Sequence, residues 1–218
     1  MKHILFVLVM AFTSFSAFAQ DAEFQEMLRR AESGDAWAQL ELGVMYDNGI
    51  GVSENDQEAV KWSRLAAEQG LAGAQAVLGI MYEQGRGVVQ NYQEAVKWTQ
   101  LAAEQGLGIA QLKLGVMYAN GRGVAEDDQE AVRWYRLAAG QGLAEALYNL
   151  GLMYTRGDGV VQNYSRAYFW FSVGAAQGYA PAAEARNIVA EDALSPEALE
   201  EAQAQATRCF ESNFKDCD

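Results

Sequence analysis

Residues 70–105, GLAGAQAVLGIMYEQGRGVVQNYQEAVKWTQLAAEQ, form a unit that the chain repeats. When the sequence is shifted along itself by 36 residues, it falls into register. The positions that recur at this spacing are Gly34, Gly70, Gly106, Gly142 and Gly178, and Trp62, Trp98, Trp134 and Trp170. A fixed period of about 20 to 50 residues is typical of repeat architectures, in which each unit buries its apolar face against its neighbours. The sequence therefore predicts a stack of four repeats.

The first half of each unit predicts an amphipathic helix. In the second copy this helix covers 72–82, where Ala74, Leu78 and Met81 fall on one stripe at helical spacing. Gly79 lies inside the helix, where glycine costs ~0.5–1 kcal/mol relative to alanine. The same choice recurs at Gly43, Gly115 and Gly151. We expect a close approach by the partner helix to offset this cost.

The second half of each unit predicts a glycine loop and another helix. The segment 84–88 contains two glycines that can adopt positive φ and end the first helix. Asn91 is a good N-cap, and Glu94 three residues later completes a pattern similar to a capping box. The residues expected on the inner face of the second helix are Ala95, Trp98, Leu101 and Ala102.

The full pattern is A-x-A-Q-x-x-L-G-x-M-Y-x-x-G-x-G-V followed by A-x-x-W-x-x-x-A-A-x-Q-G, and it runs four times from Gly34 to Gly178. It resembles the Sel-one-like repeat, a 36-residue relative of the tetratricopeptide repeat. The resemblance implies an all-α fold, an α/α solenoid of four helix-turn-helix repeats with capping helices at both ends. Members of this family mostly serve as adaptors and scaffolds, so it also implies binding of a protein or peptide without catalysis.

A disulfide-rich branch of this family, in Helicobacter, has been linked to the binding and hydrolysis of β-lactams. The resemblance therefore leaves open an alternative function, an enzyme that acts on a β-lactam or a cell-wall peptide. The repeats of that branch carry paired cysteines, which are missing from the repeats of this chain.

The ends of the chain differ from the repeats. Residues 1–19 have a basic start, an apolar run and a small-x-small site at Ala17–Ala19, which predicts a cleaved signal peptide and a periplasmic or secreted protein. Residues 20–33 predict an N-terminal capping helix, and residues 34–178 hold the repeats. In residues 179–218 we expect capping helices over the aromatic run YFWF of the fourth repeat, followed by a tail. The alternative for this run is an exposed aromatic docking patch.

Charge and the scarcity of histidine limit the chemistry. The formal net charge is −13, and cleavage of the signal peptide makes it more negative by one because Lys2 is lost. This acidity argues against nucleic acid as a partner and favours a basic one. Cleavage also removes the one histidine, which excludes Ser-His-Asp and Cys-His sites. We expect no cofactor, no metal site and no transmembrane segment.

Two sequence features at the C-terminal side allow other chemistry. Cys209 and Cys217 are the two cysteines, and in an exported protein they predict a disulfide. Ser212 and Lys215 between them form an S-x-x-K, the nucleophile motif of penicillin-recognising enzymes. The stretch 156–158 spells RGD, the tripeptide that integrins read, in a loop whose glycines the turn requires. Adhesion through that loop stays open.

Candidate binding residues follow from the family's geometry. In tetratricopeptide-like stacks the first helices line a concave groove, where their variable positions face a partner. These positions lie at i, i+4 and i+11 of each first helix, and Gly73 occupies one of them. The candidates are Trp37, Glu41, Asn48, Val77, Gln84, Ile109, Lys113, Asn120, Glu145, Asn149 and Arg156. Trp37 is the strongest anchor, because repeat packing does not require an aromatic residue there. The alternative is that Trp37 packs on the N-terminal capping helix.

Overall fold

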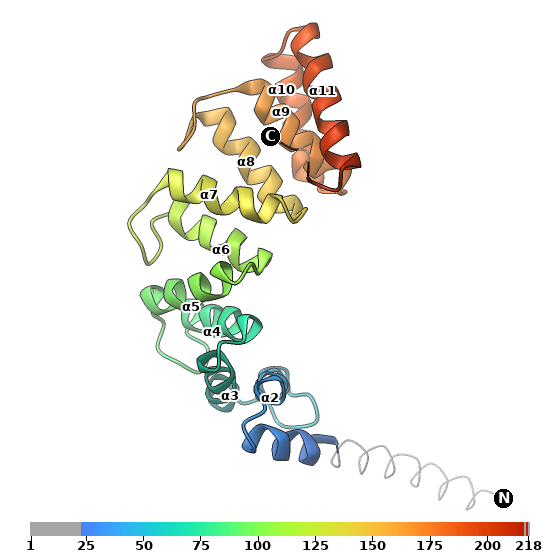
Figure 1. The fold of residues 1–218 in the computed structure, drawn as a ribbon. Coiled ribbons are helices and arrows are strands. Elements are labelled where there is room, and N and C mark those ends of the chain that lie inside the picture. Colours follow the sequence, from blue (N-terminus) through green and yellow to red (C-terminus); the bar gives the residue numbers. More distant parts are fainter. Residues whose placement is uncertain (1–22, 216, 218) are drawn as a thin grey trace, which may run out of the picture. The chain divides into compact units, whose positions relative to one another are not determined.

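The computed structural model describes residues 23–215 and 217, and all their regular elements are α-helices (Figure 1). Residues 23–32 are helical, and they are followed by α2 (Ala36–Asn48), α3 (Asp56–Glu68), α4 (Ala72–Gln84), α5 (Tyr92–Glu104), α6 (Gly108–Ala119), α7 (Asp128–Ala139), α8 (Ala144–Arg156), α9 (Tyr164–Ala176), α10 (Ala180–Asp192) and α11 (Pro196–Glu211). The predicted all-α fold of paired helices is confirmed. The predicted signal peptide lies outside the described residues.

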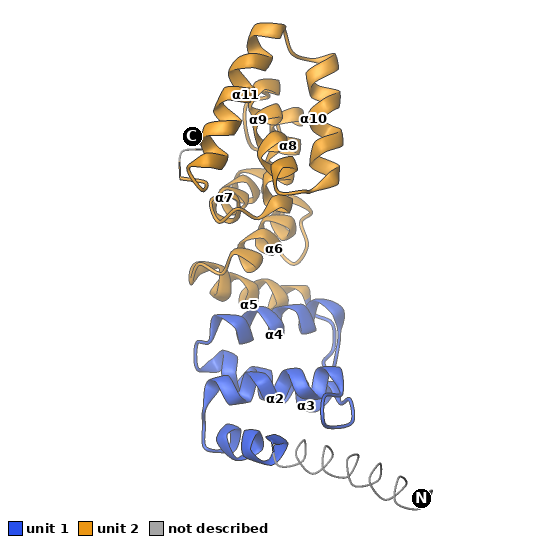
Figure 2. Cartoon of the chain, turned by 90° about the vertical axis from the view of Figure 1, so that its right-hand side faces the viewer, with its two compact units in different colours: residues 1–91 blue, residues 92–218 orange. Residues whose placement is uncertain are grey.

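The chain divides into two compact units, residues 1–91 and residues 92–218, which Figure 2 shows in blue and orange. In the N-terminal unit, the helix over 23–32 packs on the first repeat. Phe24 and Ala31 from this helix are buried in one cluster with Ala38 and Leu42 of α2 and Trp62 of α3. The helix therefore covers an apolar face of the first repeat, as a capping helix should.

In the C-terminal unit, α10 and α11 cover the aromatic run on α9. Phe169 and Phe171 are each 1% exposed, and Phe171 packs against Tyr148 of α8 with ring centroids 5.7 Å apart. Val189 of α10 and Ala202 of α11 belong to the same buried cluster as Phe171. The expectation that the C-terminal helices bury this run is confirmed.

Glycines inside the first helices allow the second helices to approach closely. A Cβ atom on Gly43 would lie 2.6 Å from the Oγ of Ser63, and one on Gly115 would lie 2.6 Å from the ring of Tyr135. A Cβ on Gly151 would overlap the ring of Phe171. Real Cβ atoms do not approach so closely, so glycine is required at these positions. The predicted close approach of the partner helix is confirmed there.

The loop between the helices is held by a contact that the sequence pattern does not predict. Asn55 and Glu58 are the counterparts of Asn91 and Glu94 in the first repeat. Asn55 caps α3, with its side chain accepting hydrogen bonds from the backbone N–H of Gln57 and of Glu58. The backbone N–H of Asn55 donates to the carbonyl of Tyr46 at 2.9 Å, where a capping box would use the side chain of Glu58. Glu58 instead pairs with Lys61 at 2.9 Å. Only half of the expected capping box is therefore formed.

The repeated tryptophans lie in the core, as expected. Trp98 is 8% exposed, and its Nε1 donates to Glu94 at 3.2 Å. The prediction that Leu101 lies on the inner face is wrong, because this side chain is 38% exposed. The equivalent Leu137 is also exposed, because the helix turns this position away from the first helix of its repeat.

We predict opposite effects for two glycine-to-alanine changes in first helices. Gly115→Ala should destabilise the fold by about 1–3 kcal/mol, because Tyr135 and the backbone of α7 leave no room for a methyl group. At Gly73 a Cβ atom would make an ordinary contact 3.4 Å from Leu40, so Gly73→Ala should stabilise by up to ~1 kcal/mol. Denaturant unfolding measures both changes, and equal effects would contradict the packing described.

We also predict that Trp98→Ala costs ~3–5 kcal/mol of unfolding free energy, as truncations of large buried side chains do. Leu101→Ala on the same helix is the matched control, and it should cost less than about 1 kcal/mol because that side chain is partly in solvent. The measurement is chemical denaturation of the full chain. A Trp98→Ala protein with the wild-type midpoint would show that the indole contributes nothing to the core.

Candidate functional site

The N-terminal unit contains an apolar hollow beside α2. Its volume is about 490 Å³, and it opens between the helix over 23–32, one side of α2 and the loop that follows α2. Its lining residues are Glu23, Met27, Trp37, Leu40, Glu41, Val44, Met45, Ile50 and Gly51. Two predicted binding residues, Trp37 and Glu41, therefore share one cavity.

The start of α2 is fixed so that Trp37 is presented at the hollow. Asp35 is the N-cap of α2, and its Oδ1 accepts hydrogen bonds from the backbone N–H of Trp37 at 3.0 Å and of Ala38 at 3.1 Å. Its Oδ2 pairs with Arg30 of the preceding helix at 2.7 Å. The hydrogen bond from Arg30, with that of Ala38, holds the pKa of Asp35 below its usual value. Asp35 thus ties the first turn of α2 to the preceding helix.

Three large apolar side chains of the hollow face solvent. Trp37 is 63% exposed, Ile50 is 55% exposed and Val44 is 37% exposed. Single exposed apolar side chains are common, whereas a group of them in one depression indicates a binding surface. The N-terminal helix lines the hollow but leaves most of the Trp37 side chain exposed.

Comparison with the other repeats shows that packing does not require these residues. The position of Trp37 is occupied by Gly73, Ile109 and Glu145 in the other copies. The position of Ile50 is occupied by Arg86, Arg122 and Asp158. A residue that the repeat does not need, and that remains exposed, is a candidate for function.

The hollow combines an apolar floor with acidic groups. Glu23 and Glu41 both line it, and both are exposed. Within the described part of the chain, neither carboxylate lies in a close ion pair, while Glu26, Asp35 and Asp47 of the same unit each do. Asp35 raises the pKa of Arg30 most, and the charge of Glu41 adds to that effect from a greater distance. This arrangement can accept an apolar side chain that is flanked by a basic one.

The other predicted residues of the N-terminal unit do not line the hollow. Asn48 is exposed, and its side chain donates to the carbonyl of Val44 at 2.9 Å at the end of α2. Val77 is half-buried on α4, and Gln84 is exposed. Ile50 was missed by the sequence reasoning, although an apolar residue inside a G-x-G loop that elsewhere holds Arg or Asp is a detectable signal.

The predicted residues of the C-terminal unit lie on α6 and α8. Exposed positions are Ile109, Asn120, Glu145 and Arg156, and half-buried ones are Lys113 and Asn149. Asn120 donates to the carbonyl of Val116 at 2.7 Å, as Asn48 does on α2. Arg156 lies 4.0 Å from Asp158, within the RGD stretch. Ile109 is the one exposed apolar side chain among these candidates.

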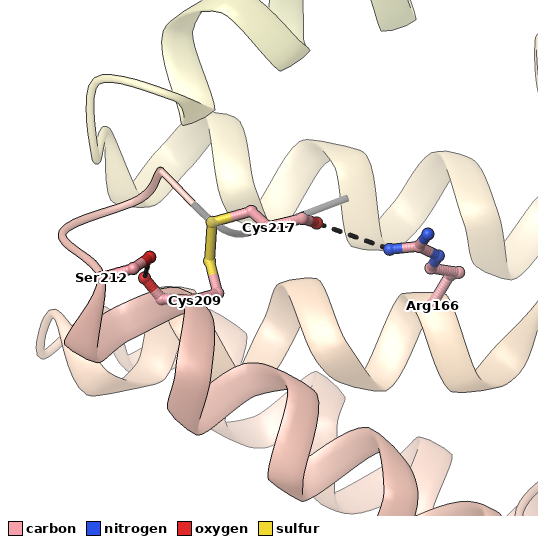
Figure 3. The surroundings of a disulfide bond; sticks show 4 residues. All are labelled: Arg166, Cys209, Ser212 and Cys217. Carbon is pink, nitrogen blue, oxygen red and sulfur yellow. Dashed lines mark hydrogen bonds between the residues drawn. A yellow bond between two sulfur atoms is a disulfide. The ribbon is translucent and has the colours of Figure 1, made fainter.

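The C-terminal tail is fastened to the unit by the predicted disulfide (Figure 3). Cys209 and Cys217 are bonded, and Arg166 of α9 donates to the carbonyl of Cys217 at 3.4 Å. The Oγ of Ser212 donates to the carbonyl of Cys209 at 2.9 Å, so the serine of the S-x-x-K stretch serves the end of α11. Phe214 packs against the turn before α8, where a Cβ on Gly142 would lie 2.7 Å from its ring.

Among residues 23–215 and 217, no three His, Cys, Asp or Glu side chains gather closely enough to hold a metal ion. In the same part of the chain, no helix has both the length and the apolar character that crossing a bilayer requires.

Comparison with protein families identifies the repeat. The Sel1 repeat model matches four consecutive segments, 38–71, 72–107, 108–143 and 144–179. The chain belongs to the Sel1 repeat family. Proteins of this family are typically scaffolds for protein–protein interactions. A comparison with curated proteins finds no match.

Solved structures of Sel1 repeat proteins are similar to this chain. A protective antigen of uropathogenic Escherichia coli strains shares 40% identity with a TM-score of 0.78 over 87% of this chain, which spans only 40% of that protein. A Sel1 repeat protein from Oxalobacter formigenes shares 32% identity with a TM-score of 0.75, over 95% of this chain and 86% of that one. The cysteine-rich protein B of Helicobacter pylori shares 19% identity with a TM-score of 0.48 over 60% of this chain and 93% of that one.

Proposed function

We propose that this chain is an exported scaffold that binds a protein or peptide partner through the exposed side of its first helices. The observation that carries the proposal is the apolar hollow around Trp37 and Ile50, residues that the repeat does not need and that solvent reaches. The scaffold role of the Sel1 family supports it. The partner can belong to the bacterial envelope or to a host cell.

In this proposal Trp37 is the principal anchor. A tryptophan buries a large area in a few rigid atoms, which is why this residue is enriched among binding hot spots. Val44 and Ile50 extend the apolar contact, and Glu41 adds a charge at its edge. Val77 and Gln84 on α4 supply secondary contacts in the N-terminal unit. The candidates on α6 and α8 belong to the C-terminal unit, and we propose them as a separate contact surface of that unit.

The partner should have basic character. The chain carries a formal net charge of −13, and an acidic surface attracts a basic partner over distances that salt limits to about 8–10 Å. Raising salt from low to physiological concentration should therefore slow association more than it speeds dissociation. We include no catalytic step, because Ser212 is engaged at a helix end in the one motif that suggested one.

We predict that Trp37→Ala weakens binding of the partner by at least ~1 kcal/mol, about fivefold or more in dissociation constant. The immobilised full chain would first capture partners from envelope extracts and from host-cell extracts, with identification by mass spectrometry. The affinity of the captured protein for the wild type and for the variant is then measured by interferometry. Circular dichroism confirms that the variant stays folded.

The control is Ile188→Ala, which truncates a side chain of α10 that is 60% exposed, about as much as Trp37. This change should leave the affinity unaltered. Equal binding by the wild type, Trp37→Ala and Ile188→Ala would show that the partner uses another face of the protein.

Export has its own prediction. A disulfide between Cys209 and Cys217 persists in oxidising compartments, and its presence supports a periplasmic or secreted location. Protein recovered from the envelope or the medium should begin at Gln20 and be two hydrogens lighter than the dithiol form. Replacing both cysteines with serine should cost roughly 2–3 kcal/mol of stability. Protein that retains Met1 and two free thiols would contradict export.

A further inference from the structure

Contacts inside the N-terminal unit show how the first helices of consecutive repeats meet. Leu40 of α2 lies against Gly73 of α4, at 3.4 Å from the place of a Cβ atom. Asp47 near the end of α2 pairs with Arg86 in the loop that follows α4. A first helix therefore contacts the next repeat at two positions, the one of residue 73 and the one of residue 86.

One period earlier, the same two positions are Trp37 and Ile50. Both line the hollow, and both are more than half exposed. Their counterparts Gly73 and Arg86 each contact α2, so Trp37 and Ile50 face the place where a preceding first helix would lie.

The register of the helix over 23–32 gives independent evidence that a first helix could lie beside Met27. The helix over 23–32 has the register of a second helix, since Phe24 and Ala31 correspond to the buried Val60 and Ala67. Met27 corresponds to Ser63, which is fully buried against Gly43 in the first helix of its own repeat. Met27 is only half-buried and lines the hollow. Met27 packs on the cluster that includes Leu42 of α2, and within residues 23–91 no first helix of its own repeat covers it as Gly43 covers Ser63.

Charge restricts what can fill this place. Glu23 and Glu41 line the hollow and lie in no close ion pair within the described residues, which favours an occupant with lysine or arginine. A second copy of this chain is disfavoured, because each copy carries a net charge of −13. The occupant that fits the geometry and the charge is therefore a basic, amphipathic helix.

We propose that the hollow accepts such a helix from a partner protein, which packs beside α2 as the first helix of an additional repeat would. A small residue of the partner helix lies over Met27, and apolar residues meet Trp37 and Ile50. This inference rests on the proposed binding function and specifies the partner segment. In this proposal the partner inserts a helix at the hollow and does not bind as an extended peptide along α6 or α8.

The test uses synthetic helices and the full chain. The probe has the sequence of residues 36–48 with phenylalanine for Trp37, lysine for Glu41 and Asn48, and leucine for Asp47, and it is stapled to hold the helix. Asp47 pairs with Arg86 in the second repeat, and the counterpart of Arg86 in the first repeat is the apolar Ile50. An apolar leucine therefore replaces Asp47 in the probe. One control probe carries glutamate in place of both lysines. The other has no staple and carries proline in place of Leu42, which breaks the helix.

We expect the lysine probe to bind saturably, as measured by fluorescence anisotropy. The proline probe should bind at least about tenfold more weakly if the helix is what is recognised. The glutamate probe should bind more weakly by about fivefold or more, and the double variant Glu23→Lys/Glu41→Lys should prefer it over the lysine probe.

Variants of the chain locate the probe. Trp37→Ala and Ile50→Arg, which introduces the residue of the second and third repeats, should each weaken binding by about fivefold or more. The matched control Ile188→Ala should leave the affinity unchanged, since it removes an exposed apolar side chain of α10 outside the hollow. Each variant is checked for folding by circular dichroism.

Several results would overturn the inference: no binding of the lysine probe, equal binding of the helical and proline probes, or binding that Trp37→Ala and Ile50→Arg leave intact. If Ile109→Ala weakened binding of the probe and Trp37→Ala did not, the binding site would lie on α6 instead. If the captured partner of the previous section depends on Trp37 while the probes fail, the scaffold function stands and helix insertion is wrong. If neither binding is found, both proposals fail.

Discussion

The repeats depend on the close contact between a glycine of the first helix and a side chain of the second helix, which is seen at Gly43, Gly115 and Gly151. Gly43 meets Ser63, and Gly151 meets Phe171, so this contact accommodates both a small and a large side chain. Glycine costs a helix ~0.5–1 kcal/mol, but here it removes the Cβ atom that would hold the helices apart. The helix pair can therefore recur every 36 residues while the side chain over the glycine varies.

Features that recur with the period could be predicted from the sequence, and features of a single position could not. The helix pairs, the buried Trp98 and the need for glycine at Gly115 follow from residues that appear in every copy. Trp37 was found because it departs from its counterparts. The roles of Met27 and Ile50 in the hollow follow from the contacts of their counterparts, Ser63 with Gly43 and Arg86 with Asp47. Such contacts are visible only in three dimensions.

The two units complete their terminal repeats differently. In the C-terminal unit, Val173 has the position of the exposed Leu137 but is buried in one cluster with Ala206 and Cys209 of α11. The disulfide then holds Phe214 on the turn at Gly142. In the N-terminal unit, the helix over 23–32 buries Phe24 and Ala31 but leaves Met27 and Trp37 open to the hollow. The incomplete repeat therefore offers a surface that a partner helix can complete.

Accessibility of the Trp37 indole tests this account most directly. The chain has five tryptophans, and Trp37 should dominate acrylamide quenching because the four that recur every 36 residues are at most 8% exposed. The difference in fluorescence between the wild type and Trp37→Phe gives the contribution of Trp37. The account predicts that saturating lysine-bearing helix protects Trp37 from acrylamide and shifts its emission to shorter wavelength. Full quenching of Trp37 in the saturated complex would contradict the claim that a partner helix packs beside α2.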